Sequence, residues 1–133
     1  MNSDVSGNRP VAEDYGEGKI LLVVDDDPRI CRMVTRRLLC RFEALLTACT
    51  AAEAEQTLMR ERVSHLVCDN DLGGGAPRGT ALIAGWRSRY PSIERAVLFT
   101  GGIGPDEAAS ASGIDAVVYK TTDFDILTRA LGL

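Results

Sequence analysis

The stretch Ile20–Pro28, which reads Ile-Leu-Leu-Val-Val-Asp-Asp-Asp-Pro, contains the strongest structural signal in this chain. Five apolar residues, typical of a buried strand in a parallel sheet, end in three consecutive carboxylates, Asp25, Asp26 and Asp27. Adjacent like charges repel, so the cluster destabilises a fold unless a cation neutralises it. Magnesium, a hard cation that accepts one or two protein carboxylates, is the natural candidate. The alternative is a turn in which Asp27 caps a helix that begins at Pro28.

The composition is typical of a globular protein with one domain. The chain has 133 residues, of which 45% are hydrophobic and 26% are charged, so it can bury a sizeable core. Its net charge is −4 and it has no basic run, which gives no indication of nucleic-acid binding. No apolar stretch approaches the roughly 20 residues of a membrane span. We expect residues 1–18 to form a flexible polar tail and residues 19–133 to form the domain.

The cysteines and the N-terminus predict a cytoplasmic protein. The four cysteines contain no C-x-x-C pair, and a single histidine cannot complete a usual zinc site. We therefore expect reduced, mostly buried thiols, with Cys68 in the core although it precedes Asp69. The N-terminus lacks the apolar core of a signal peptide. His65 begins a strand without a metal-binding neighbour, which favours a structural role.

Apolar runs alternate with helical patterns from Lys19 onward. The expected strands are Ile20–Val24, Ala44–Ala48, His65–Cys68, Ala96–Phe99 and Ala116–Tyr119. Helices are expected to begin at Pro28, at the capping box Thr50–Glu53, near Thr80, at Pro105 and at Asp123. Strands that alternate with helices indicate an α/β fold with a parallel sheet covered on both faces. Such sheets bind ligands beyond the carboxyl ends of their strands.

Four of the expected strand ends carry residues that suit a phosphoryl group bound with magnesium. In chain order they are Asp25–Asp27, Asp69 with Asp71, Thr100 with Gly101, and Lys120. Carboxylates hold the metal, the ammonium and hydroxyl groups bind phosphoryl oxygens, and the glycine leaves space for the group to approach. Each residue alone is more often a cap or a surface residue. Their occurrence together, at four strand ends, predicts one site.

From Lys19 to Leu131 this arrangement resembles the receiver domain of two-component response regulators. The resemblance implies a flavodoxin-like, doubly wound, five-stranded parallel sheet in the order 2-1-3-4-5, with helices on both faces. It implies a signalling phospho-acceptor rather than an enzyme, served by a histidine kinase or a phosphotransfer protein and acting on an unknown output protein. Because the chain ends shortly after Lys120, we expect a stand-alone receiver or one cut from a longer protein.

The resemblance also implies a role for individual residues. Asp69 matches the phospho-acceptor, and Asp25 and Asp26 match the acidic pair. Asp26 is implied to bind magnesium directly, whereas Asp25 acts mainly through water. The other implied roles are a backbone carbonyl ligand to the metal at Asp71, the switch hydroxyl at Thr100, space for the phosphoryl group at Gly101, and phosphate pairing at Lys120.

The loop after Asp69 departs from the family pattern. Gly73 stands where receivers usually carry a proline, and Pro77 stands where they carry a glycine. The next glycine is Gly79, so the loop is expected to be longer than usual. The run Gly73–Gly75 is either a phosphate cradle or flexible spacing. Spacing is favoured, because no Lys-Ser or Lys-Thr pair follows as in a P-loop.

Two further departures concern the last strand. Thr121 replaces the proline that follows the lysine, and a non-proline cis bond costs about 2.5–4 kcal/mol, so the isomer of the Lys120–Thr121 bond is open. Val117 replaces the aromatic switch residue, and valine has no ring to swing. We therefore predict that the signal passes through the loop after Thr100 rather than through Tyr119.

Two alternatives remain open beside the phosphorelay interpretation. A degenerate receiver would act only as a binding module. The second alternative is a phosphohydrolase of the haloacid-dehalogenase type, because Asp69-Asn-Asp71 resembles the nucleophile motif of that family and Leu-Phe-Thr100 resembles its second motif. That family needs an acidic pair after its lysine, and too little chain follows Lys120 to supply it.

Overall fold

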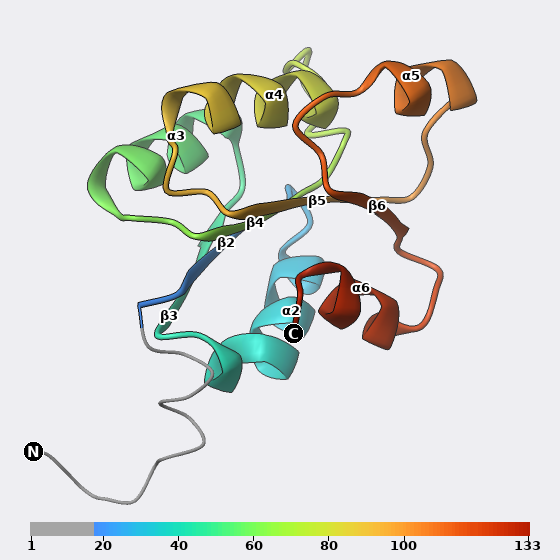
Figure 1. The fold of residues 1–133 in the computed structure, drawn as a ribbon. Helices are drawn as coiled ribbons and strands as arrows, with labels where there is room; N and C mark the ends of the chain where they lie inside the picture. The colour runs from blue at the N-terminus through green and yellow to red at the C-terminus, as the bar shows by residue number, and fades with distance from the viewer. Residues whose placement is uncertain (1–17) are drawn as a thin grey trace, which may run out of the picture.

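The computed structural model describes residues 18–133 (Figure 1). The tail expected at 1–18 lies outside these residues, apart from Gly18. The elements are β2 (Ile20–Val24), α2 (Pro28–Leu38), η1 (Leu39–Arg41), β3 (Ala44–Ala48), α3 (Ala51–Arg60), β4 (His65–Cys68), α4 (Gly79–Arg89), β5 (Arg95–Thr100), α5 (Pro105–Ser110), β6 (Ala116–Tyr119) and α6 (Phe124–Ala130). The five expected strands and five expected helices are all present, with ends that differ by one or two residues.

The strands form one parallel sheet in the order β3-β2-β4-β5-β6. Numbered by strand alone, this is the order 2-1-3-4-5, which confirms the predicted flavodoxin-like topology. Val24 at the end of β2 is level with Ala48 in β3 and with Cys68 in β4. Thr100 at the end of β5 is level with Tyr119 in β6. The residues that follow these strands therefore meet at one edge of the sheet.

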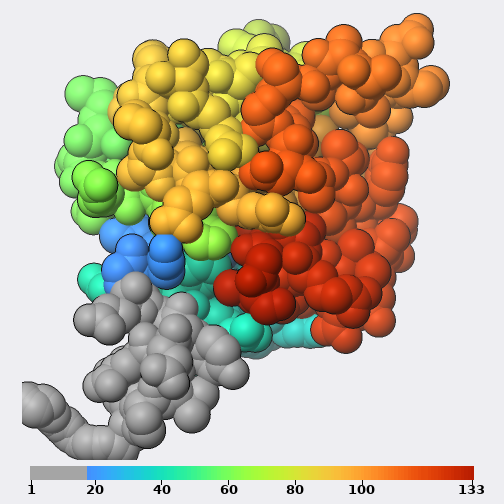
Figure 2. Space-filling view, in the orientation of Figure 1, coloured from blue at the N-terminus to red at the C-terminus, as the bar shows by residue number. Residues whose placement is uncertain are grey.

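Helices cover both faces of the sheet. Figure 1 shows α3, α4 and α5 above the sheet and α2 and α6 below it. Successive strand residues point to opposite faces, so Leu22 belongs to the core under α3 and α4, and Leu21 belongs to the core over α2 and α6. Trp86 of α4 is fully buried in the first core. In the space-filling view α5 (orange) projects at the upper corner of the molecule (Figure 2).

The helix starts show why Asp27 differs from its two neighbours. Its Oδ1 accepts a hydrogen bond from the backbone N–H of Arg29 at 2.9 Å, and Pro28 occupies the first helical position of α2. The Arg29 guanidinium also pairs with Asp27 at 3.0 Å. Asp27 is therefore a helix cap, as the alternative interpretation predicted, while Asp25 and Asp26 remain available for other chemistry.

Several smaller expectations can be compared with the structure. All four cysteines are free, as expected, but only Cys31 and Cys68 are buried; Cys40 and Cys49 are exposed, so the expectation of mostly buried thiols was wrong for these two. Every peptide bond within residues 18–133 is trans, including the bond that follows Lys120. Over the same residues, none of the helices has the length and apolar character required to cross a membrane.

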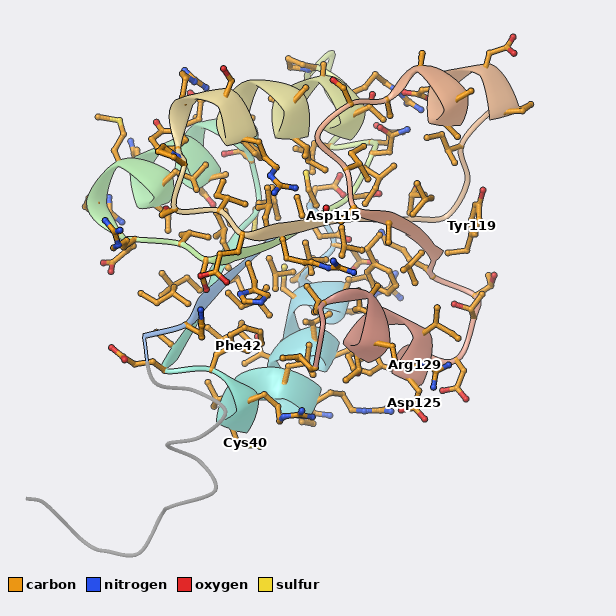
Figure 3. The ribbon with its side chains drawn as sticks, in the orientation of Figure 1. Cys40, Phe42, Asp115, Tyr119, Asp125 and Arg129 are labelled. Carbon is orange, nitrogen blue, oxygen red and sulfur yellow. The ribbon has the colours of Figure 1, made fainter. Side chains whose placement is uncertain are left out.

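His65 is packed as a structural residue. Its Nδ1 lies 2.8 Å from the Ser64 hydroxyl oxygen, and its ring meets the Phe42 ring edge-on at 5.1 Å between centroids. Phe42 lies near the start of β3 (Figure 3). Burial lowers the pKa of His65 below its usual value of 6.5, because the charged form loses hydration there.

Candidate functional site

The backbone of the site is fixed by the sheet itself. The N–H of Asp25 donates to the carbonyl of Ala48 at 3.0 Å, and the N–H of Asp69 donates to the carbonyl of Val24 at 2.9 Å. The N–H of Lys120 donates to the carbonyl of Thr100 at 2.9 Å. Asp25, Asp69 and Lys120 thus each stand one position beyond a strand and still take part in the hydrogen bonds between strands.

Three carboxylates gather at this edge. One oxygen from each of Asp25, Asp26 and Asp69 lies within 4.8 Å of the other two. Asp25 and Asp69 are only 1% and 7% exposed, whereas Asp26 is exposed. A set of close, largely buried carboxylate oxygens fits a hard divalent cation and repels itself without one. The donor chemistry of these residues therefore fits the magnesium site that the sequence predicted.

Lys120 supplies positive charge to the same carboxylates. Its Nζ lies 2.7 Å from Asp25 Oδ2 and 3.2 Å from Asp69 Oδ2, and its side chain is 20% exposed. Burial alone would lower the pKa of Lys120, but the hydrogen bond and charge of Asp25 and the charge of Asp69 raise it above its usual value. Burial raises the pKa of Asp25, and this effect exceeds the opposing influence of Lys120. The ammonium thus stays charged between two carboxylates.

An open pocket of about 520 Å³ lies over these groups. Its lining comprises Asp26, Asp69, Asp71, Gly73, Arg78, Thr100, Gly101, Gly102 and Lys120. Of the residues predicted from the sequence, only Asp25 is absent from the wall, because it is buried beneath it. The pocket therefore exposes a carboxylate, a hydroxyl and an ammonium group to one incoming molecule.

Thr100 and Gly101 occupy the places that the sequence predicted. The Thr100 side chain is buried, and its hydroxyl donates to the Gly102 carbonyl at 3.0 Å. The N–H of Gly102 donates back to that hydroxyl oxygen at 3.2 Å. Gly101 has open space where a Cβ would lie. In this structure the hydroxyl is thus engaged with its own loop.

Asp71 presents its side chain differently from the other carboxylates. Its Oδ1 accepts a hydrogen bond from the N–H of Gly73 at 2.9 Å, which closes a tight turn at the pocket rim. Gly73 has a φ of 76°, a left-handed conformation that glycine adopts without strain, and a Cβ there would lie 3.4 Å from Asp26 Oδ2. Gly73 lines the pocket, whereas Gly74 and Gly75 are absent from its lining.

A second network borders the pocket, and the sequence did not predict it. Glu107 of α5 accepts hydrogen bonds from the Arg78 guanidinium, from Asn70 Nδ2 and from the Thr80 hydroxyl, all at 3.1 to 3.2 Å. The N–H of Asn70 donates to Asp69 Oδ1 at 2.8 Å. The only signal in the sequence was the loop after Asp69, which was expected to be longer than usual and which carries Arg78 to the rim.

Cys68 is a core residue, as predicted. It is fully buried, and its thiol donates a weak hydrogen bond to the Asp69 carbonyl at 3.2 Å. Burial, together with the charge of Asp69, raises the pKa of the Cys68 thiol far above its usual value. Cys68 is therefore an inert thiol that supports Asp69 through its backbone.

Comparison with known proteins identifies relatives in one family. The chain is 31% identical over 112 residues to the transcriptional regulatory proteins GlrR of Escherichia coli K12 and QseF of Escherichia coli O157:H7. The match covers 84% of this chain and 25% of each relative, so the chain spans about a quarter of their length. No protein-family model matches the chain.

Solved structures agree with these relatives. A response regulator from Burkholderia pseudomallei with a phosphorylated aspartic acid, a calcium ion and citrate is 27% identical, with a TM-score of 0.74 over 85% of this chain and 66% of that one. The response regulator TrrA from Thermotoga maritima, in complex with Mg²⁺-BeF, is 22% identical, with a TM-score of 0.72 over 86% of this chain and 96% of that one. The fold, the acidic pocket and these relatives agree, and the chain belongs to the receiver domains of response regulators.

Proposed function

We propose that residues 19–133 act in the cytoplasm as a receiver that accepts a phosphoryl group on Asp69 from a histidine kinase or a phosphotransfer protein. The observation that carries this proposal is the position of the Asp69 carboxylate, 3.2 Å from Lys120 Nζ and beside two further carboxylates at the mouth of an open pocket. The structure of a relative from Burkholderia pseudomallei contains a phosphorylated aspartic acid. That relative supports the same chemistry here.

The transfer step follows from the chemistry of a carboxylate and a phosphohistidine. An oxygen of Asp69 forms a bond to phosphorus while the P–N bond to the donor imidazole breaks, and the leaving nitrogen takes a proton from water. Repulsion between the anionic Asp69 and the incoming phosphoryl oxygens opposes this step. Lys120 offsets part of that repulsion and remains in place to pair with the product.

The carboxylates of Asp25, Asp26 and Asp69, with the backbone carbonyl of Asp71, form the proposed magnesium site. Bound magnesium supplies positive charge that stabilises the transferring phosphoryl group. Asp26 is exposed to the pocket, which suits a direct ligand. Asp25 is tied to Lys120 at 2.7 Å, which suits a role through water.

The proposed output is a change in the loop after β5. To reach a phosphoryl oxygen, the Thr100 hydroxyl has to give up its hydrogen bond to the Gly102 carbonyl, which frees residues 101–104 to rearrange. The altered surface would then bind an output protein. Receivers are signalling phospho-acceptors, and the response regulators found by comparison support this role over that of a phosphohydrolase.

The binding-only alternative predicts no covalent chemistry, so one experiment separates the two. The chain is incubated with acetyl phosphate, with and without magnesium, and then measured by intact mass spectrometry. We expect one added phosphoryl group only with magnesium, and none in Asp69→Asn. Labelling of the Asp69→Asn variant at another residue, or no labelling of the wild-type chain under any condition, would contradict the proposal.

A further inference from the structure

Arg78 is the second cationic residue in the wall of the Asp69 pocket, beside Lys120. It immediately precedes Gly79, whose backbone N–H donates to the Asn70 carbonyl at 2.9 Å. Gly79 has no room for a Cβ, because that atom would overlap the Asp69 carbonyl oxygen. The main chain at Arg78 is therefore held close to the proposed phospho-acceptor.

The guanidinium of Arg78 is engaged by Glu107 in this structure. Arg78 Nε lies 3.1 Å from Glu107 Oε2, and one terminal nitrogen lies 3.1 Å from Oε1, so the pair is bidentate. The Arg78 side chain is 51% exposed and that of Glu107 is 27% exposed. An ion pair with this exposure is worth little and is readily exchanged for another anion.

Glu107 ties α5 to the rest of the domain. None of the residues of α5 is buried, and α5 has no side-chain cap, so core packing does little to hold it. Both carboxylate oxygens of Glu107 bind Arg78, and they also bind Asn70 and Thr80. Removal of Arg78 from this network would take away two of its four hydrogen bonds, and α5 would loosen.

A phosphoryl group on Asp69 would compete with Glu107 for Arg78. It carries a charge of about −1.5 to −2 and three strong acceptor oxygens, against one negative charge on Glu107. Its oxygens match the planar fork of an arginine as well as a carboxylate does.

We propose that Arg78 is a phosphoryl-binding residue of the Asp69 site, held by Glu107 until the phosphoryl group arrives, and that its transfer loosens α5. This inference rests on the proposed function of Asp69. It gives the loop after Asp69 a function, because this loop places Arg78 at the pocket rim, where the guanidinium can bind either Glu107 of α5 or the phosphoryl group.

The test measures how tightly beryllofluoride binds, in the presence of magnesium, to the full wild-type chain and to three variants of it. Binding is monitored through the amide NMR signals of Asp69 and Thr100. In Arg78→Gln the affinity should fall about tenfold, because charge-assisted hydrogen bonds to the phosphoryl analogue are lost. In Glu107→Gln it should rise about two- to fivefold, because the competitor is removed. The control is Arg89→Gln. Arg89 is the last residue of α4, far from the pocket, and forms an exposed ion pair with Glu55 of α3, so its loss should change the affinity by less than about twofold.

The opposite signs distinguish phosphoryl binding from a merely structural role. If Arg78 only anchored α5, removal of either partner would break the same contact, and both variants would shift in the same direction. Equal shifts, or no effect of Arg78→Gln, would therefore overturn the proposal while leaving Asp69 as a phospho-acceptor. A wild-type chain that binds no beryllofluoride would instead overturn the proposed function, and this inference with it.

Hydrogen exchange gives a second readout. The amide of Ala108 in α5 donates to the Gly104 carbonyl at 2.9 Å. Its exchange should accelerate when beryllofluoride binds the wild-type chain, because Glu107 loses Arg78. In Arg78→Gln the exchange should be fast from the start and insensitive to beryllofluoride. A slow exchange that beryllofluoride leaves unchanged in the wild-type chain would contradict the release of α5.

Discussion

The backbone of Gly79 lies directly against the carbonyl of Asp69. A Cβ on Gly79 would overlap that carbonyl oxygen, and it would lie 2.9 Å from the Cα of Asn70. The first residue of α4 therefore presses on the residue that we propose as the phospho-acceptor. Only glycine fits, so the position of Asp69 depends on a residue ten places further along the chain.

Gly79→Ala should destabilise the domain and disturb the pocket. The added methyl group meets backbone atoms that cannot move aside easily, and such overpacking typically costs about 1–3 kcal/mol. Thermal or urea unfolding measures this cost. The control is Gly85→Ala in the same helix, where a Cβ has open space. Alanine loses less conformational entropy than glycine on folding, so this change should raise stability by about 0.5–1 kcal/mol. Equal effects of the two substitutions would contradict the close contact.

Asp26→Ala should reduce the stabilisation by magnesium more than Asp25→Ala does. Asp26 faces the pocket, whereas Asp25 is buried and paired with Lys120. The measurement is the shift in melting temperature on addition of magnesium. Asp27→Ala is the matched control, because loss of the helix cap should cost about 1 kcal/mol and leave the shift caused by magnesium intact. A shift that survives in Asp26→Ala would count against this site.

Lys120→Met should destabilise the metal-free domain by roughly 3 kcal/mol, because it leaves the buried carboxylates of Asp25 and Asp69 without their cation. Magnesium should restore much of this loss, so the stabilisation that it gives should be larger in the variant than in the wild-type chain. Urea unfolding with and without magnesium tests both statements. If magnesium stabilised the two forms equally, Lys120 and the metal would not be acting on the same charges.

Stability should fall as the pH drops below about 6.5, and His65 should account for part of that fall. Its folded-state pKa is lowered by burial from 6.5, so the folded chain takes up this proton less readily than the unfolded chain. The contribution of the neutral His65 ring to the free energy of unfolding is fully present above pH 6.5, and it is lost as the pH falls through the lower folded-state pKa. The difference in unfolding free energy between wild type and His65→Gln should therefore shrink between pH 7 and 5. A difference independent of pH would contradict this assignment.

Tyr119→Ala should leave the response to beryllofluoride intact. Tyr119 is 40% exposed and points away from the sheet at the end of β6, whereas Val117 packs against the core beneath α4 (Figure 3). The largest amide shifts on adding beryllofluoride are expected at residues 100–106 in both Tyr119→Ala and Tyr119→Phe. Should Tyr119→Ala abolish those shifts while Asp69 still bound beryllofluoride, the tyrosine would be part of the switch.

The sheet and the central acidic site were predictable because their signals are local. The run Ile20–Val24 identifies a strand buried on both faces, and parallel topology then brings the ends of all such strands to one edge. That topology predicts that Lys120 lies near Asp25 and Asp69, whereas the ion pairs between their side chains are seen only in the structure. The roles of these residues in phosphoryl transfer remain predictions.

The contacts of Glu107 could not be predicted in the same way. Its partners Asn70, Arg78 and Thr80 come from a loop and a helix start, and no periodic pattern relates them to α5. Whether an arginine on a longer loop turns toward the pocket or toward solvent depends on three-dimensional packing. The exposure of Tyr119 likewise depends on where α5 and β6 end, which the sequence gives only approximately.

The loop between Asp71 and Gly79 is a suitable place to insert a reporter group. Gly74 and Gly75 have open space around them, but their φ values of 57° and 75° would strain any other residue, so an insertion between them suits this tip better than a substitution. The hydrogen bond from Gly79 to Asn70 closes the loop at its base, and the entropy of loop closure grows only slowly with length. A fluorescent reporter inserted at this tip would sit beside the pocket without displacing the Asp69 backbone. If Asp69 accepts a phosphoryl group as proposed, such a reporter would convert the receiver into an optical sensor of that modification.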